Sequence, residues 1–308
     1  MKTDLDALMQ AHNLDALLVT GPGQHNPAMV YLTGGGHLTS ADLIKVRGKE
    51  AVLFFNPMER DEAARTGLRT RNLAEYRLHE LQKEVGGDLV KATARRYTLM
   101  LTELGITAGR VALYGRGEVG TTYAIFSALQ AELPGLTLIG ETSTSVLMQA
   151  MGTKDPGEIE RIRKMGQITT AVVGKTAEFL TSHAVRDEIL IKADGQPLTI
   201  GEVKSHINLW LAERGADNPE GTIFAIGRDA GVPHSSGKAS DPLRLGQTIV
   251  YDIFPCEAGG GYYYDFTRTW CLGYAPAEVQ ALYQDVLDVY TQVTTAMTAG
   301  THCPVYQK

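Results

Sequence analysis

The sequence predicts an α/β N-terminal domain followed by a second domain organised around a long helix and a β-hairpin that carries two aspartates. Three observations support this prediction. Strand-like and helix-like runs alternate over the first 150 or so residues, a pattern typical of α/β layers with a parallel or mixed sheet. A helix cap and a long helical pattern begin at Asp155. Two β-prone runs with a glycine-rich turn between them occupy residues 250–270.

Composition limits the classes of function. A chain of 308 residues predicts about two domains, and its 44% hydrophobic content is enough for sizeable cores. The 29 basic and 35 acidic residues give a net charge of −6. With this acidic balance, and with no basic tract interleaved with aromatic residues, we expect no nucleic-acid partner.

The sequence also predicts a cytoplasmic protein. The N-terminus lacks an apolar core of signal-peptide length, and the absence of any apolar run of about 18 residues predicts no membrane partner. The three cysteines, Cys256, Cys271 and Cys303, are too few for a disulfide framework, which fits a reducing compartment. None belongs to a CxxC pair, so a thiolate zinc site is not expected.

We assign the N-terminal domain to residues 1–152. Apolar periodicity and glycine or proline stops define its elements. The expected elements are a helix over 3–13, a strand over 14–20, a strand from 30 that enters the glycine turn 34–36, a strand over 51–55, a helix over 88–104, a strand over 110–114 and a helix over 121–133.

The second domain is assigned to residues 153–308. Asp155, Pro156 and Glu158 form an N-terminal cap, and Thr199 with Glu202 has the spacing of a capping box. The expected elements are a long helix over 156–180, a helix from 199 to 215, a strand over 222–226, a loop over 227–246, the hairpin, and a helix over 276–298.

The hairpin contains the first candidate site. If its turn centres on Ala258 and Gly259, Asp252 and Asp265 lie opposite each other on one face. Isolated strand aspartates commonly face solvent or cap turns, whereas the apolar flanks here favour burial. Neighbouring carboxylates repel, so one is expected to be protonated unless a cation lies between them. Carboxylate oxygens suit Mn²⁺, Mg²⁺ or Zn²⁺. The spacing leaves the metal and non-metal interpretations open.

Three further residues are candidates. His234 follows Pro233 in the loop before the hairpin, where it either stabilises a turn or carries a proton above the carboxylates. Thr267 shares the face of Asp265 and either hydrogen-bonds near a metal or occupies an ordinary sheet position. Arg268 points to the opposite face, where a clamp on a neighbouring carboxylate is a more common role than catalysis.

Several of these motifs together resemble a known family. The residues concerned are Asp252, then Gly261-Tyr262, then Asp265-Phe-Thr-Arg-Thr-Trp270, with Pro233-His234 upstream, the helix opening at 154–163 and the N-terminal element at 26–34. This set resembles the pita-bread metallopeptidase family M24, which includes Xaa-Pro aminopeptidase, prolidase, methionine aminopeptidase and creatinase. The likeness extends over nearly the whole chain, and the hairpin is its most specific part.

The resemblance implies a creatinase/prolidase-type N-terminal domain and an α+β pita-bread catalytic domain. It implies that Asp252 binds one divalent ion and that Asp265 bridges two, with Mn²⁺ expected and Co²⁺ or Zn²⁺ as alternatives. A bridging hydroxide would attack the scissile carbonyl, while His234 would hold or protonate the substrate. The large N-terminal domain favours the Xaa-Pro aminopeptidase and prolidase branch, hence a peptide substrate with proline at the second position. A homodimer is a further expectation from the family.

Two departures from the family pattern bear on this expectation. The aspartates are two residues further apart than the family usually has, and an even insertion keeps both on one face. The family's remaining ligands, one histidine and two glutamates, follow the second aspartate, where this chain offers only Glu278 and His302. We therefore expect an incomplete catalytic domain, truncated at its C-terminus, that exposes a sheet face and is inactive alone. A non-catalytic binding relative and a metal-free creatinase-type amidinohydrolase are the alternatives.

Overall fold

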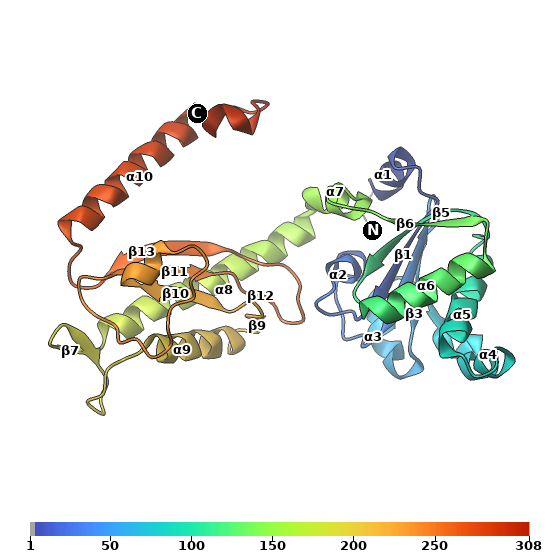
Figure 1. The fold of residues 1–308 in the computed structure, drawn as a ribbon, viewed down its shortest axis with the longest axis horizontal. Helices are drawn as coiled ribbons and strands as arrows, with labels where there is room; N and C mark the ends of the chain where they lie inside the picture. The colour runs from blue at the N-terminus through green and yellow to red at the C-terminus, as the bar shows by residue number, and fades with distance from the viewer. Residues whose placement is uncertain (1–3, 308) are drawn as a thin grey trace. The chain divides into compact units, whose positions relative to one another are not determined.

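The computed structural model describes residues 4–307, which form two compact units (Figure 1). One unit takes the chain up to Arg163 together with Glu257–Tyr263. The other takes Lys164–Cys256 and the chain from Tyr264 onward. The segment Glu257–Tyr263 is the tip of the aspartate hairpin, so the hairpin contributes residues to both units.

The N-terminal unit contains a mixed six-stranded sheet in the order β4-β3-β2-β1-β5-β6. β1 pairs with β2, and β2 with β3, in antiparallel fashion, whereas the β3/β4, β1/β5 and β5/β6 pairs are parallel. Its elements are α1 (Leu5–Ala11), β1 (Ala16–Gly21), α2 (Pro27–Thr33), β2 (Ala41–Val46), β3 (Ala51–Phe55), α3 (Arg60–Arg65), β4 (Arg69–Asn72), α4 (Leu78–Glu84), α5 (Leu89–Glu103), β5 (Gly109–Gly115), α6 (Val119–Glu132), β6 (Leu136–Gly140) and α7 (Val146–Gly152).

Both faces of this sheet are buried, because its central strands alternate apolar side chains between two cores. Leu17 and Val19 pack with residues of α1, α2, α3 and α7. Ala16 and Leu18 pack with residues of α5 and α6 on the opposite face. The result is the predicted α/β layered domain, with helices on both sides of the sheet.

The prediction for residues 30–36 was wrong, because this segment ends a helix rather than forming a strand. Asn26 is the N-cap of α2, where its side chain accepts a hydrogen bond from the Met29 amide at 3.4 Å. Pro27 occupies the first turn, and Gly34 ends the helix in the left-handed region at φ 82°. These are ordinary start and stop signals of a helix, and here they outweigh the β-prone side chains between them.

β2 was not predicted from the sequence. Its six residues are all buried, even though two of them are charged. The Lys45 ammonium donates to Asp6 Oδ1 at 2.6 Å and to the Lys49 carbonyl at 2.6 Å. Asp42 accepts a hydrogen bond of 2.6 Å from the Tyr97 hydroxyl. Burial raises the pKa of Asp42, and the Tyr97 hydrogen bond opposes this only in part.

The second unit contains a three-stranded antiparallel sheet in the order β10-β11-β13. One face of this sheet packs against two helices, α8 and α9, in a single apolar core. The Tyr251 and Thr176 hydroxyls lie 3.3 Å apart inside that core. The elements of this part of the chain are α8 (Pro156–Thr181), β7 (Ala184–Arg186), β8 (Ile189–Ile191), α9 (Ile200–Ala212), β9 (Ala216–Asp217), β10 (Thr222–Ile226), β11 (Thr248–Ile253), β12 (Cys256–Glu257), β13 (Phe266–Cys271) and α10 (Ala277–Ala296).

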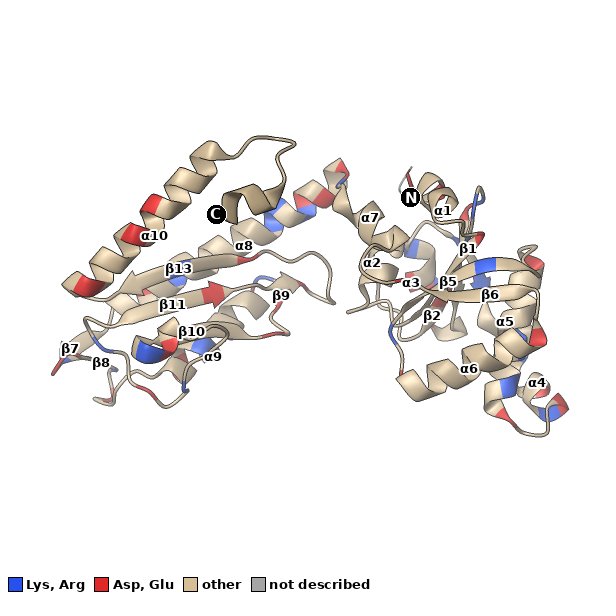
Figure 2. Ribbon diagram, turned by 45° about the horizontal axis from the view of Figure 1, so that its top comes forward, with Lys and Arg blue, Asp and Glu red and all other residues tan. Residues whose placement is uncertain are grey.

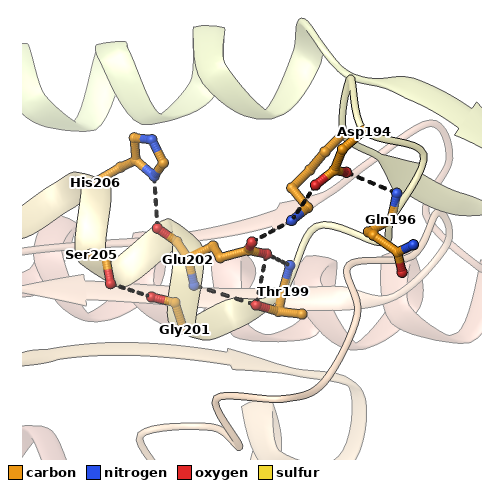
Figure 3. A network of polar contacts seen from close by, with 8 residues as sticks. Asp194, Gln196, Thr199, Gly201, Glu202, Ser205 and His206 are labelled. Carbon is orange, nitrogen blue, oxygen red and sulfur yellow. Dashed lines mark hydrogen bonds and ion pairs between the residues drawn. The ribbon is translucent and has the colours of Figure 1, made fainter.

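The predicted capping box at the start of α9 is present (Figure 3). The Thr199 side chain accepts from the Glu202 amide at 3.4 Å, and the Glu202 carboxylate accepts from the Thr199 amide at 2.9 Å. The Lys192 ammonium donates to the other oxygen of that carboxylate at 2.6 Å and so ties the preceding loop to the helix. This network fixes where α9 begins under the sheet.

The last helix, α10, carries acidic side chains but no basic ones (Figure 2). Several large apolar side chains along it are exposed, among them Leu282, Val286 and Tyr290. Among the helices of residues 4–307, none is both long and apolar enough to cross a membrane.

Candidate metal centre

The first strand of the hairpin places Asp252 on the face of the sheet opposite to α8 and α9. Along β11 the burial alternates, with Ile249, Tyr251 and Ile253 buried and the residues between them half-buried. The period of two therefore directs the Asp252 carboxylate to the less covered face of the sheet.

The pairing of the two hairpin strands differs from the predicted one by two residues. Asp252 lies opposite Thr267, not opposite Asp265. The same register continues past the sheet, since the Tyr264 amide donates to the Pro255 carbonyl at 3.1 Å. The turn is consequently centred one residue later than predicted. Because the shift is even, Asp265 keeps the face of Asp252 and lies diagonally across from it.

The two carboxyl groups interact directly. Desolvation is the largest cause that raises the pKa of Asp265, although the residue is exposed. The negative charge of Asp252 and a hydrogen bond with its side chain raise this pKa further. A cation beside the two carboxyl groups would offset the repulsion that Asp265 experiences from Asp252. Two adjacent carboxylates, open to solvent and held on a hairpin, form a donor set that suits a hard divalent cation.

The expected burial of this pair was wrong. Asp265 and Thr267 are exposed, and Asp252 is half-buried. The physical reason is that α8 and α9 cover only the opposite face of the sheet. An exposed sheet face was expected from an incomplete catalytic domain, and within residues 4–307 this face is open around Asp265.

Thr267 and Arg268 occupy opposite faces of β13, as predicted. The Thr267 hydroxyl donates to Asp252 Oδ1 at 2.6 Å. The guanidinium of Arg268 lies 3.9 Å from the centroid of the Phe266 ring, and its Nη1 donates to the Thr267 carbonyl at 2.7 Å. Within the part of the chain that the structure describes, Arg268 makes no carboxylate contact, and the carboxylate clamp stays a prediction. Thr267 orients the Asp252 carboxylate.

His234 and Asp252 line the same pocket, which has a volume of about 300 Å³. Strand residues of β10 and β11 line it on one side, and the segment 229–235 on another. His234 is exposed and has a left-handed backbone with φ 60°. A non-glycine residue in that region is uncommon and strained, which often marks a functional position. Asp265 is not part of the lining.

Among the described residues, no group of three or more His, Cys, Asp or Glu side chains is arranged to hold a metal ion. The carboxylate pair therefore fits a cation as two of its ligands, without a third from residues 4–307. Three further residues meet at the hairpin tip: Arg161, Glu257 and Tyr262. Tyr262 and the stretch around Arg161 belong to the motifs named from the sequence, but their contact with Glu257 was not predicted.

Comparisons with family models and with solved structures follow the two units. Residues 3–146 match the model of the creatinase/prolidase N-terminal domain. Residues 160–307 match the model of metallopeptidase family M24. The predicted boundary between residues 152 and 153 lies in the segment between the two matches. No curated protein sequence matched the chain.

Three similar solved structures are an X-Pro aminopeptidase from Thermotoga maritima, a prolidase from Thermococcus sibiricus and aminopeptidase P from E. coli. The first is 21% identical with a TM-score of 0.66, and the match covers 94% of this chain and 71% of that one. The second is 17% identical with a TM-score of 0.69, and the match covers 98% of this chain and 73% of the prolidase. The third is 18% identical with a TM-score of 0.66, and the match covers 98% of this chain and 69% of aminopeptidase P.

These likenesses confirm the predicted fold, a creatinase/prolidase-type N-terminal domain followed by a pita-bread domain. The family models account for nearly all of the chain and confirm the family prediction. The protein belongs to metallopeptidase family M24, in the branch that carries a creatinase/prolidase N-terminal domain.

Proposed function

We propose that the protein is a dinuclear metal-dependent peptidase that releases the first residue from peptides with proline at the second position. Family membership and the likeness to prolidases and aminopeptidases P support a peptidase. The observation that carries the finer proposal is the adjacent Asp252–Asp265 carboxylate pair beside the His234 pocket.

In this proposal Asp252 and Asp265 would each supply a carboxylate to the divalent ions. The carboxylate pair supplies only part of a complete ligand set, and the family resemblance implies a histidine and two glutamates as the other ligands. The bound ions lower the pKa of water and polarise the scissile carbonyl. Mn²⁺ is the proposed ion because the ligands on this chain are hard carboxylate oxygens.

The residues of this chain have distinct roles. Thr267 donates to Asp252 Oδ1 and would orient this carboxylate for a cation. His234, in the pocket that Asp252 also lines, binds the substrate and protonates it near the cleaved bond, since an imidazole exchanges protons near neutral pH. The cytoplasmic location and the homodimer predicted from the sequence stay predictions.

The test is Mn²⁺-dependent release of the first residue from Xaa-Pro peptides by the full-length protein. Both a dipeptide and a longer peptide are assayed, because the first identifies a prolidase and the second an aminopeptidase. Asp265→Ala should abolish the release, while Asp285→Asn on exposed α10 serves as a control that keeps it.

Two results would contradict the proposal. A folded full-length protein without peptidase activity favours the non-catalytic binding relative. Full peptide release in Asp265→Ala, or release that survives removal of all divalent metal, would show that the reaction does not use the proposed metal site.

A further inference from the structure

The glycine-rich tip of the hairpin, Glu257–Tyr263, is held by backbone hydrogen bonds within the N-terminal unit. The Glu257 amide donates to the Tyr262 carbonyl at 3.0 Å, and the Gly260 amide donates to the Glu257 carbonyl at 2.9 Å. The His25 amide donates to the Gly259 carbonyl at 2.8 Å. The first two bonds close the loop 258–261, and the third attaches it to the segment before α2.

An ion pair strengthens this attachment. Arg161 donates from Nε to Glu257 Oε1 at 2.9 Å and from Nη2 to Oε2 at 2.7 Å, and the Tyr262 amide donates to Oε2 at 2.8 Å. Arg161 also donates to the Gly34 carbonyl at 3.1 Å and lies 4.8 Å from the Tyr262 ring centroid. A bidentate, partly buried pair is stronger and more directional than an exposed one.

The loop leaves no room for side chains. A Cβ on Gly260 would lie 2.6 Å from His25 Nδ1, and one on Gly259 would lie 2.8 Å from Gln24 Nε2. Gly259 and Gly260 both adopt left-handed conformations, at φ 85° and 82°. The tip is therefore built to dock in one position and is not a loose surface loop.

The position of the tip determines the pairing of the aspartates. Asp265 lies only two residues beyond Tyr263, the last residue of the tip. Moving the turn centre by one residue shifts the strand pairing by two, which is the difference between the predicted register and the observed one. Such a shift would move Asp265 along the strand relative to Asp252.

We propose that Glu257 and Arg161 are positioning residues for the metal-binding aspartates: by clamping the tip, they hold Asp265 diagonal to Asp252 on the shared face of the hairpin. This inference rests on the proposed metal site. It assigns a metal-organising role to residues that contact neither the ion nor the substrate.

The experiment measures Mn²⁺ binding to this chain by electron paramagnetic resonance of the free ion. Glu257→Gln removes the charge with little change of shape and should weaken Mn²⁺ binding by up to about tenfold, the lower end of the loss seen when a group that orients metal ligands directly is removed. Arg161→Lys keeps the charge but loses the bidentate geometry, so its loss should be smaller. Glu160→Gln is the matched control, because Glu160 pairs with Arg163 on the same helix.

A second measurement is hydrogen exchange of the Tyr264 amide, which bonds to the Pro255 carbonyl across the hairpin. It should become faster in Glu257→Gln and stay unchanged in the control. Lower thermal stability of Glu257→Gln with unchanged Mn²⁺ affinity and unchanged exchange would overturn the proposal, because the pair would then only stabilise the fold. If Glu257→Gln fails to fold, Arg161→Lys decides by the same criteria.

Asp252→Asn separates this inference from the proposed function. If Asp252→Asn binds Mn²⁺ as well as the unaltered chain, the aspartates are not the metal site and both proposals fail. If Asp252→Asn loses binding but Glu257→Gln and Arg161→Lys do not, the metal site stands and the positioning role is wrong.

Discussion

The hydrogen bond from Thr267 to Asp252 offers a direct test of how the candidate site is organised. We expect Thr267→Val to weaken Mn²⁺ binding. Valine keeps the shape and the β-branched side chain, so the strand is preserved. The change removes only the hydroxyl that donates to Asp252 Oδ1 at 2.6 Å.

The size of the effect follows from the length and exposure of this bond. An O–H to carboxylate contact of 2.6 Å lies in the charge-assisted range. Hydrogen bonds to charged groups contribute about 1.5–3 kcal/mol. Thr267 is exposed and Asp252 half-buried, so water replaces part of the lost bond. About 1 kcal/mol remains, which corresponds to roughly a fivefold higher Kd.

The assay is a Mn²⁺ titration that follows the free ion, with Thr269→Val as the matched control. Thr269 occupies the same face two residues further along β13, opposite Val250. The control should bind Mn²⁺ like the unaltered chain. An unchanged Kd in Thr267→Val, or an equal loss in Thr269→Val, would refute the idea that this hydroxyl orients the carboxylate.

Three further predictions concern the fold. Burial raises the pKa of Asp42 above its value in the unfolded chain, so the contribution of Asp42 to stability is present in acid and is lost as the pH rises. In urea titrations, Asp42→Asn should therefore raise the free energy of unfolding more at about pH 7.5 than at about pH 4.5. A difference that does not depend on pH would contradict this. Thr199→Ala removes half of the capping box and should lower the free energy of unfolding by about 1 kcal/mol, whereas an unchanged urea midpoint would count against the cap. A thiol reagent should label exposed Cys303 in the native protein but buried Cys256 only after unfolding, and early labelling of Cys256 would show that the core opens locally.

Elements marked by their own local signals were predictable from the sequence. The helix cap at Thr199 and the stop at Gly105 are local chemistry, and α9 and α5 are found close to the expected positions. β2 was missed because Asp42 and Lys45 break its apolar pattern. Their partners, Tyr97 and Asp6, lie far away in the sequence, so only the tertiary structure shows that the charges are satisfied.

The site was predictable in its composition but not in its geometry. Alternation along two strands places Asp252 and Asp265 on one face for every turn that shifts the strand pairing by an even number of residues, and that much is observed. The register depends on which of the neighbouring glycines forms the turn. In the structure, contacts of His25 and Arg161 with the tip fix the position of the turn, and these contacts cannot be read from the sequence. The exposure of the two aspartates could not be predicted either, because it depends on which elements cover each face of the sheet.

The left-handed backbone at His234 has a consequence for protein engineering. A non-glycine residue at φ 60° costs about 1–2 kcal/mol relative to glycine, which adopts this conformation without strain. A laboratory selection for heat resistance alone would therefore favour His234→Gly early. Such a selection would remove the His234 imidazole, which shares a pocket with Asp252, so thermostable variants should be screened for turnover at every round.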